Sequence, residues 1–168
     1  MQAPLVVVTG VSGSGKSVVG QALADRLGVT YADGDDFHSP ANVAKMRAGE
    51  PLSDEDRRPW LDAIGRWLHA HTGSGAVASC SALRRAHRAQ LLRAAPGAIF
   101  LHLNADTDVL RERLRQREDH FMPEPLLDTQ LATLEPLGAD EPGTTLAAEA
   151  PPDALVRDFL RWSRSIPR

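Results

Sequence analysis

The chain has 168 residues, a formal net charge of -3 at pH 7 and 24% charged residues. That length fits one domain, 1–168, which can bury roughly two-thirds of its unfolded surface without a disulfide or a metal ion to hold it together. The balanced charge indicates neither a nucleic-acid-binding surface nor a membrane-binding face. The single cysteine, Cys80, excludes an internal disulfide, and no signal-like apolar run opens the chain, so we expect a cytoplasmic protein.

Short apolar runs alternate with longer amphipathic runs, a pattern typical of a parallel sheet wrapped by helices. The apolar runs predict strands at Leu5–Val8, Val29–Ala32, Ala76–Ser81, Ala98–Leu103 and about Thr144–Ala147. The amphipathic runs predict the helices. One ends before Gly28, one begins at Pro40 and one begins after Ser53. Others cover Arg84–Ala95, about Asp106–Arg117, Leu126–Leu134 and the residues after Pro151. We therefore expect an α/β fold in three layers, with a five-stranded parallel sheet flanked by helices.

A phosphate-binding sequence joins the first predicted strand to the first predicted helix. Residues 10–17, GVSGSGKS, match the Walker A pattern completely. Glycines let successive backbone N–H groups point at phosphate oxygens, and the helix N-terminus adds its positive end. Lys16 can reach the β- and γ-phosphates, and the Ser17 hydroxyl suits a Mg²⁺ ligand. The pattern predicts the P-loop NTPase fold, with a nucleotide bound by Gly10, Ser12, Gly13, Ser14, Gly15, Lys16 and Ser17.

An acidic turn, DGDDFH at residues 33–38, follows the second predicted strand. Because the carboxyl ends of parallel strands face the ligand crevice, carboxylates here can serve a metal ion and an attacking hydroxyl. By position we assign Asp33 to the metal and Asp35 to the acceptor hydroxyl, against the alternative of a solvated acidic turn. His38 stays open between a capping or surface role and a ligand role.

Arginines decorate the predicted helix at about Asp106–Arg117. Arg113 and Arg117 are four residues apart, share a face and lie beside apolar positions, whereas Arg111 and Arg115 point further out. We expect the inward pair to neutralise charge on a transferring phosphoryl group, and the outer pair to be solvated. The polar, proline-bounded segment at about 117–125 is a candidate lid that closes over the site.

Several blocks of sequence together resemble the gluconokinase family. They are residues 10–17, 33–42 (DGDDFHSPAN), 45–46, 49–52, 54–61 (DEDRRPWL), 80–84 (CSALR), 120–123 (HFMP), 126–127 and 133–136 (TLEP). Many enzymes share the Walker A block, but the other blocks are more specific and occur here in the family's order. They span roughly four-fifths of the chain.

The resemblance implies a kinase related in fold to nucleoside monophosphate and shikimate kinases. It implies ATP, Mg²⁺ and D-gluconate as reactants, 6-phosphogluconate as product, and commonly a homodimer. In this sequence it implies that Lys16 and Ser17 serve the phosphates and metal, and that Asp35 meets the acceptor hydroxyl. The implied substrate-binding residues are Asp35, His38, Arg58, Arg84 and His120, with a substrate-binding helical segment at about 38–72.

The sequence departs from the family pattern in two places. Glu118 and Asp119 precede His120 where the family usually has a small or basic pair, which changes the charge of the candidate lid. The segment 138–150 matches weakly, which leaves the adenine-contacting loop unassigned. Two alternatives stay open, namely a P-loop kinase for another small polyol acid or shikimate, and a non-catalytic ATP-binding sensor. Acceptor-dependent ATP turnover separates the enzyme from the sensor.

Overall fold

The protein is built around one parallel β-sheet, as seen in a computed structural model that describes residues 3–116 and 124–166. The strands are β1 (Leu5–Thr9), β2 (Thr30–Asp33), β3 (Ala76–Ser79), β4 (Ala98–Asn104) and β5 (Gly143–Ala147). They lie in the order β2-β3-β1-β4-β5, with every neighbouring pair parallel. β1 is central, so Leu5 pairs with Ala76 on one side and with Ala98 on the other.

Helices connect the strands. They are α1 (Lys16–Leu27), the 3-10 helix η1 (Gly34–Phe37), α2 (Pro40–Arg47), α3 (Asp54–Ala70), α4 (Arg85–Ala94), α5 (Thr107–Arg115), α6 (Glu124–Thr133) and α7 (Pro152–Arg164). α3 begins after Ser53, as the sequence predicts, and Ser53 and Asp56 form a reciprocal capping box at its start. None of the described helices has the length and apolar character that crossing a membrane requires.

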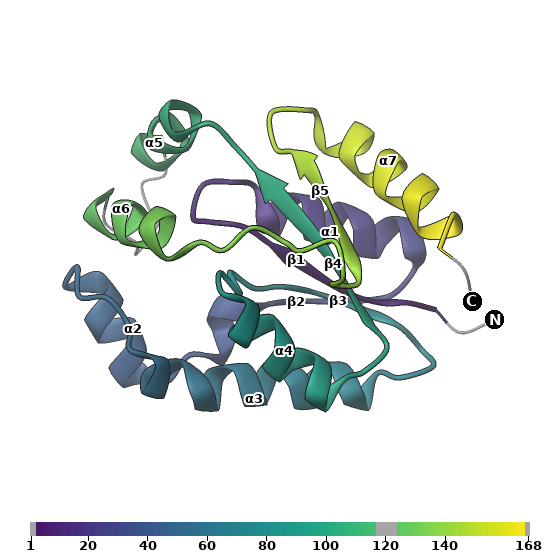
Figure 1. Ribbon diagram of the computed structural model, residues 1–168, viewed down its shortest axis with the longest axis horizontal. Coiled ribbons are helices and arrows are strands. Elements are labelled where there is room, and N and C mark those ends of the chain that lie inside the picture. Colours follow the sequence, from purple (N-terminus) through teal and green to yellow (C-terminus); the bar gives the residue numbers. More distant parts are fainter. Residues whose placement is uncertain (1–2, 117–123, 167–168) are drawn as a thin grey trace.

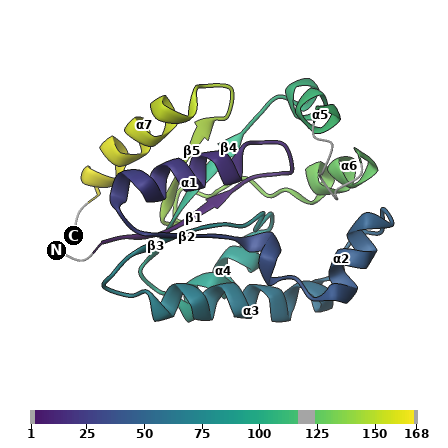
Figure 2. The same ribbon diagram turned by 180° about the vertical axis from the view of Figure 1, so that it is seen from behind.

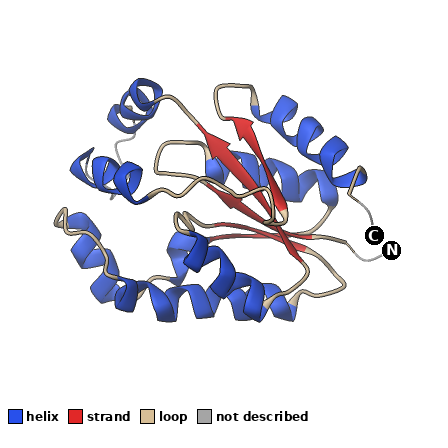
Figure 3. Ribbon diagram, viewed as in Figure 1, coloured by secondary structure: helices blue, strands red, loops and turns tan. Residues whose placement is uncertain are grey.

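The helices form a layer on each side of the sheet. Figures 1 and 2 show α1 and α7 over one face, and α3 and α4 over the other. The remaining helices α2, α5 and α6 lie at the end toward which the strands point (Figure 1). Figure 3 shows the loop that leaves β1 at this same end. Parallel sheets of this kind bind ligands beyond the carboxyl ends of their strands, so this end is where a site is expected.

The side chains of β1 pack alternately against the two helix layers, because successive side chains of a strand point to opposite faces of the sheet. Val7 packs with Trp60 and Ile64 of α3, whereas Val6 and Val8 pack with α1 and α7. The predicted α/β fold with a five-stranded parallel sheet is confirmed.

The predicted strand ends differ from the observed ones by up to two residues. β3 stops at Ser79 rather than Ser81, because the chain turns sharply at Ala82, whose φ is 37°. The acidic turn is a 3-10 helix whose N-cap is Asp33.

Candidate active site

The phosphate-binding loop runs from β1 to α1 through conformations that only glycine tolerates well. Gly15, the N-cap of α1, has a φ of 95°. A Cβ on Gly10 would lie 2.9 Å from the backbone oxygen of Leu103 on β4. Lys16 begins α1, and its Nζ donates to the Val11 oxygen at 3.2 Å, so the side chain folds back along the loop. The loop therefore has the backbone shape and the cation of a phosphate cradle.

The acidic turn faces this loop. Asp33 ends β2, and its Oδ2 accepts a hydrogen bond from the Ser17 hydroxyl at 3.0 Å. Its Oδ1 accepts from the backbone N–H of Asp35, also at 3.0 Å, which fixes the turn. A hydroxyl and a carboxylate held together in this way are hard oxygen ligands of the type that Mg²⁺ prefers, so these residues fit the metal that P-loop kinases use.

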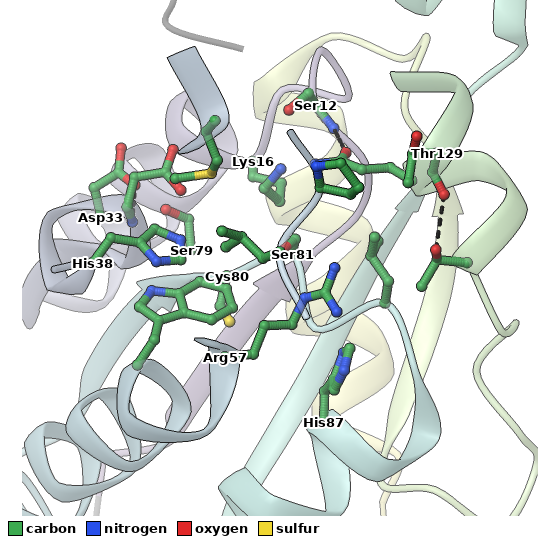
Figure 4. Close-up of a pocket in the computed structure, with 18 of the residues that line it drawn as sticks. Ser12, Lys16, Asp33, His38, Arg57, Ser79, Cys80, Ser81, His87 and Thr129 are labelled. Carbon is green, nitrogen blue, oxygen red and sulfur yellow. Dashed lines mark hydrogen bonds between the residues drawn. The ribbon is translucent and has the colours of Figure 1, made fainter. Parts of the chain in front are cut away.

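An open cavity connects the loop to the acidic turn. Its polar lining includes Ser12, Lys16, Ser17, Asp33, Asp35, His38, Arg57, Ser81, His87, Thr129 and Gln130. Figure 4 shows Lys16 and Ser12 at one side of this space and Arg57 and His87 at the other. The cavity thus has a phosphate-binding side, an acidic wall and a basic side.

Arg57 supplies the basic side from α3. Its side chain is only 16% exposed and lies 3.4 Å from Asp54 Oδ1. Burial lowers the pKa of the Arg57 guanidinium, and the charge of the neighbouring Asp54 opposes this shift. A guanidinium in this setting presents paired donors that match a carboxylate.

Neither of the arginines proposed from sequence as sugar-acid contacts lines the cavity. Arg58 is exposed, and its backbone oxygen accepts from Gln90. Arg84 is also exposed and lies 3.7 Å from Asp54. The reason is helical geometry, since Arg57 shares its face of α3 with the buried Trp60 and Ile64, and Arg58 does not. The basic contribution of this motif to the cavity is therefore Arg57.

His38 lies inside the cavity rather than on the surface. Its ring stacks on Trp60 with the centroids 4.1 Å apart, and Nδ1 lies 3.3 Å from the Asn42 amide nitrogen. Burial, followed by the Arg57 charge, lowers the pKa of His38 to about 4. The ring is therefore neutral at pH 7 and can offer a hydrogen bond to a bound ligand.

Arg113 lies behind the phosphate-binding loop, outside the cavity that holds Lys16 and Asp35. Its guanidinium donates to the backbone oxygens of Gly13, Ser14 and Ala148 at 3.3, 3.2 and 3.1 Å. Arg113 also lines a second cavity, on the far side of the loop, with Val18, Pro152 and Leu155. In this geometry it supports the loop backbone and does not face the acceptor, in contrast to the sequence-based expectation.

The other arginines of α5 behave partly as predicted. Arg115 is exposed beside Glu112 at 3.8 Å. Arg111, expected to be solvated, pairs instead with Asp128 of α6. Arg117, His120 and most of the candidate lid at 117–125 lie outside the described residues, so their predicted roles stay predictions.

Sequence reasoning missed several residues that line the cavity. Gln130 of α6 reaches the phosphate-binding loop, where its Oε1 accepts from the Ser12 N–H at 2.8 Å. Thr129, from the same helix, and His87, from α4, line the cavity as well. Arg57 was not among them, since the basic residues Lys45, Arg47, Arg57 and Arg58 are each candidates from sequence to clamp a carboxylate, and the place of Arg57 on the apolar face of α3 is the signal that selects it. The missed residues are brought in by tertiary packing from distant parts of the chain.

Comparisons with known proteins identify the family of the chain. A family model described as an AAA domain matches residues 5–137. Gluconokinase from Gluconobacter oxydans is 47% identical over 158 residues, which are 93% of this chain and 89% of that protein.

Two solved structures are similar over almost the whole chain. A gluconokinase from Sinorhizobium meliloti has a TM-score of 0.86 at 43% identity, covering 96% of this chain and 92% of that one. An unliganded sugar kinase from Janibacter sp. has a TM-score of 0.91 at 44% identity, covering 98% and 96%.

The parallel sheet, the Walker A loop and the acidic turn that faces it define a P-loop kinase. Within that class, identity of this extent over nearly the full length of its relatives decides the family. The chain belongs to the gluconokinase family.

Proposed function

We propose that the protein transfers the γ-phosphate of ATP to D-gluconate and forms 6-phospho-D-gluconate. One observation carries the proposal, namely that a single cavity brings Lys16, Asp35 and Arg57 together in a chain of the gluconokinase family. Lys16 suits the phosphates of the donor, Asp35 suits the attacking hydroxyl, and Arg57 suits an acid group. A shikimate or polyol-acid kinase would share the chemistry, but the family membership favours gluconate.

In the proposed reaction, a gluconate hydroxyl oxygen attacks the γ-phosphorus while the bond from that phosphorus to the β,γ-bridging oxygen breaks. ADP leaves, and Asp35 accepts the proton of the attacking hydroxyl. Lys16 and the loop N–H groups hold the β- and γ-phosphates. Ser17 and Asp33 offer the oxygens that would hold Mg²⁺, which neutralises phosphate charge when bound.

The carboxylate of gluconate would bind at the basic side of the cavity. We assign Arg57 to this contact, with His38, which also lines the cavity, contributing a hydrogen bond to the sugar acid. Both belong to the segment 38–72, which we propose as the substrate-binding part of the chain. The exposed positions of Arg58 and Arg84 favour Arg57 over them as the direct contact.

The adenosine end of ATP would occupy the second cavity, behind the loop. This cavity adjoins Gly13 and Gly15 and is bounded by Arg113 of α5, by Ala150 before α7 and by Pro152 at the start of α7. A planar guanidinium beside apolar side chains suits a purine ring. Arg113 would then position the loop and the base, and the segment 138–150 would supply the other side of this pocket.

Three further properties belong to the proposal. Mg²⁺ is the expected metal, because the ligands at Ser17 and Asp33 are oxygens. A homodimer is expected from the family resemblance, and light scattering after size-exclusion chromatography tests it. A cytoplasmic location is expected because Cys80 is a free, buried thiol, which suits a reducing compartment.

The test is acceptor-dependent ADP release with Mg-ATP. Gluconate, other aldonic acids, shikimate and simple sugars are compared, and phosphorus NMR of the product identifies the phosphorylated oxygen. Selective release with gluconate, giving the 6-phosphate, is expected. Release with a different acid alone would move the substrate while keeping the mechanism. No acceptor-dependent release from folded protein would favour the ATP-binding sensor.

A further inference from the structure

The tautomer of the His87 ring is defined, because one ring nitrogen accepts a backbone hydrogen bond at the start of α4. It lies in the first turn of α4, and its Nδ1 accepts the backbone N–H of Arg84 at 3.2 Å. A nitrogen that accepts a hydrogen bond carries no proton, so the neutral ring carries its proton on Nε2. The ring therefore presents one donor away from the helix backbone.

That donor is buried and lacks a close hydrogen-bond acceptor among the described residues. His87 is 5% exposed, and its Nε2 has no hydrogen-bond partner among the described residues. Asp54 Oδ1 lies 3.6 Å away, just beyond hydrogen-bond distance, but close enough that His87 is the main cause of the lowered pKa of Asp54, whose side chain is exposed. A buried N–H without an acceptor is costly, so its persistence suggests that an acceptor arrives with a ligand.

The donor borders the substrate cavity on its basic side. His87 is one of the residues that line the cavity, and Figure 4 shows its ring next to the guanidinium of Arg57. The charged groups that face the ring are Arg57 and Asp54 of α3 and Arg84 at the start of its own helix. Burial and then Arg57 lower the pKa of His87, and the opposing effect of Asp54 does not reverse the shift. At neutral pH the ring is uncharged and keeps its hydrogen bond to the Arg84 N–H.

We propose that His87 is a specificity-determining residue, whose Nε2–H donates to the carboxylate of the sugar acid beside Arg57. This inference rests on the proposed gluconokinase activity and deepens it. The guanidinium supplies charge and paired donors, and the imidazole adds a third donor from a different helix. A phosphoryl acceptor without a carboxylate would leave this donor unpaired and would offer Arg57 no second anion beside Asp54, which disfavours neutral sugars.

Two substitutions separate this role from the capping role of the same ring. In His87→Asn, the side-chain oxygen lies near the position of Nδ1 and keeps the acceptor for Arg84, but the donor at Nε2 is lost. In His87→Gln, the amide nitrogen lies near the position of Nε2, so the donor is kept and the cap is lost. For the two variants and the wild type, we would measure the steady-state kinetics with gluconate and with ATP, and the melting temperature.

The proposal predicts that His87→Asn raises the KM for gluconate roughly tenfold or more, with kcat, the KM for ATP and the melting temperature close to wild type. His87→Gln should keep the gluconate KM within about threefold and melt at a lower temperature. The reverse pattern, a silent Asn and a damaging Gln, would leave His87 as a helix cap and overturn the proposal. Absence of gluconate turnover in the wild type would instead refute the proposed function.

Discussion

Asp35 is the side chain on which the proposed proton transfer depends most directly. It lies on the cavity wall, at the start of the 3-10 helix that follows β2. A positioned general base contributes roughly two to four orders of magnitude to rate. We expect Asp35→Asn to lower kcat by about a hundredfold or more and to change ATP binding little, as measured by steady-state kinetics and nucleotide titration.

Asp36 provides the matched control for this substitution. It is the adjacent carboxylate, is exposed and is not among the residues that line the cavity. Asp36→Asn should therefore keep kcat within about twofold of wild type. A normal kcat in Asp35→Asn would remove Asp35 from the role of base.

His102 makes stability depend on pH through a buried neutral ring. It lies on β4, where Nδ1 is 2.9 Å from the Thr9 hydroxyl. Burial, followed by the charge of Arg88 and Lys16, lowers the pKa of His102 to about 4. Between that value and about 6.5 the unfolded chain binds a proton that the folded chain does not, so stability is lost as pH falls through this window.

Urea unfolding at pH 7 and at pH 4.5 tests the effect of His102. The wild type should lose free energy of unfolding between these values, by up to about 3 kcal/mol from this residue. His102→Gln can still bond to Thr9 but cannot titrate, so its loss over the same interval should be clearly smaller. An equal loss in both proteins would show that other groups control the acid sensitivity.

At the scale of elements, a buried ion pair ties α4 to the loop before β5. Arg88 is 1% exposed in its side chain and Glu141 is 6% exposed, with Arg88 Nε 2.7 Å from Glu141 Oε1. Burial acts to raise the pKa of Glu141, but Arg88 and the Gly138 N–H outweigh it and the pKa is lowered. Arg88 also donates to the oxygen of Ala82, the residue with the strained backbone after β3. This pair therefore holds the loop that carries Ser81 into the cavity.

Removing one member of that pair should be more harmful than removing both. We expect Arg88→Met to lower the free energy of unfolding by about 3 kcal/mol or more, because Glu141 is left charged and buried. Adding Glu141→Leu should recover part of that loss, as a double-mutant cycle in urea would measure.

Arg85 is the matched control on the same helix. It pairs with Asp140 at the surface, where both side chains are more than half exposed, and it lies no closer than 4.0 Å to Glu141 Oε2. Arg85→Met should change stability little. Equal losses for the two arginines would contradict the distinction between the buried and the exposed pair.

At the scale of the whole molecule, the cavity lies between parts of the chain that belong to different layers. The P-loop and α1 border it from one side, and Arg57 of α3 and His87 of α4 border it from the other. A ligand that contacts both sides is bound only by the folded protein, so it stabilises the fold by mass action.

ADP with Mg²⁺ should therefore raise the melting temperature. At about 100 times its dissociation constant, a ligand adds about 2.7 kcal/mol. For a chain of this length, this corresponds to a shift of about 5–10 °C in differential scanning fluorimetry. Chelation of Mg²⁺ should reduce the shift, and Lys16→Ala should remove most of it. Arg26→Ala, at an exposed position on the same helix, should keep the full shift, and an equal shift in Lys16→Ala would contradict the phosphate role of Lys16.

The fold was predictable because its signals are local. The β-branched run 5–8 is suited to a strand buried on both faces, and glycines and prolines mark the ends of several helices. The strand order β2-β3-β1-β4-β5 did not follow from these signals, because pairing joins residues that are distant in sequence. The same limit explains why Arg111 is bound to Asp128 across two helices, contrary to its predicted solvation.

For the site, the sequence by itself determined the phosphate loop and the acidic turn, because each is a contiguous motif whose residues are neighbours in the chain. These two motifs together indicated the reaction class. Only the tertiary structure decided which basic groups reach the cavity. Arg57 rather than Arg58 lines the cavity, and Arg113 lies behind the loop. His87 reaches the cavity from α4. The physical reason is that a side chain's direction depends on how its helix packs, and packing is a property of the whole chain.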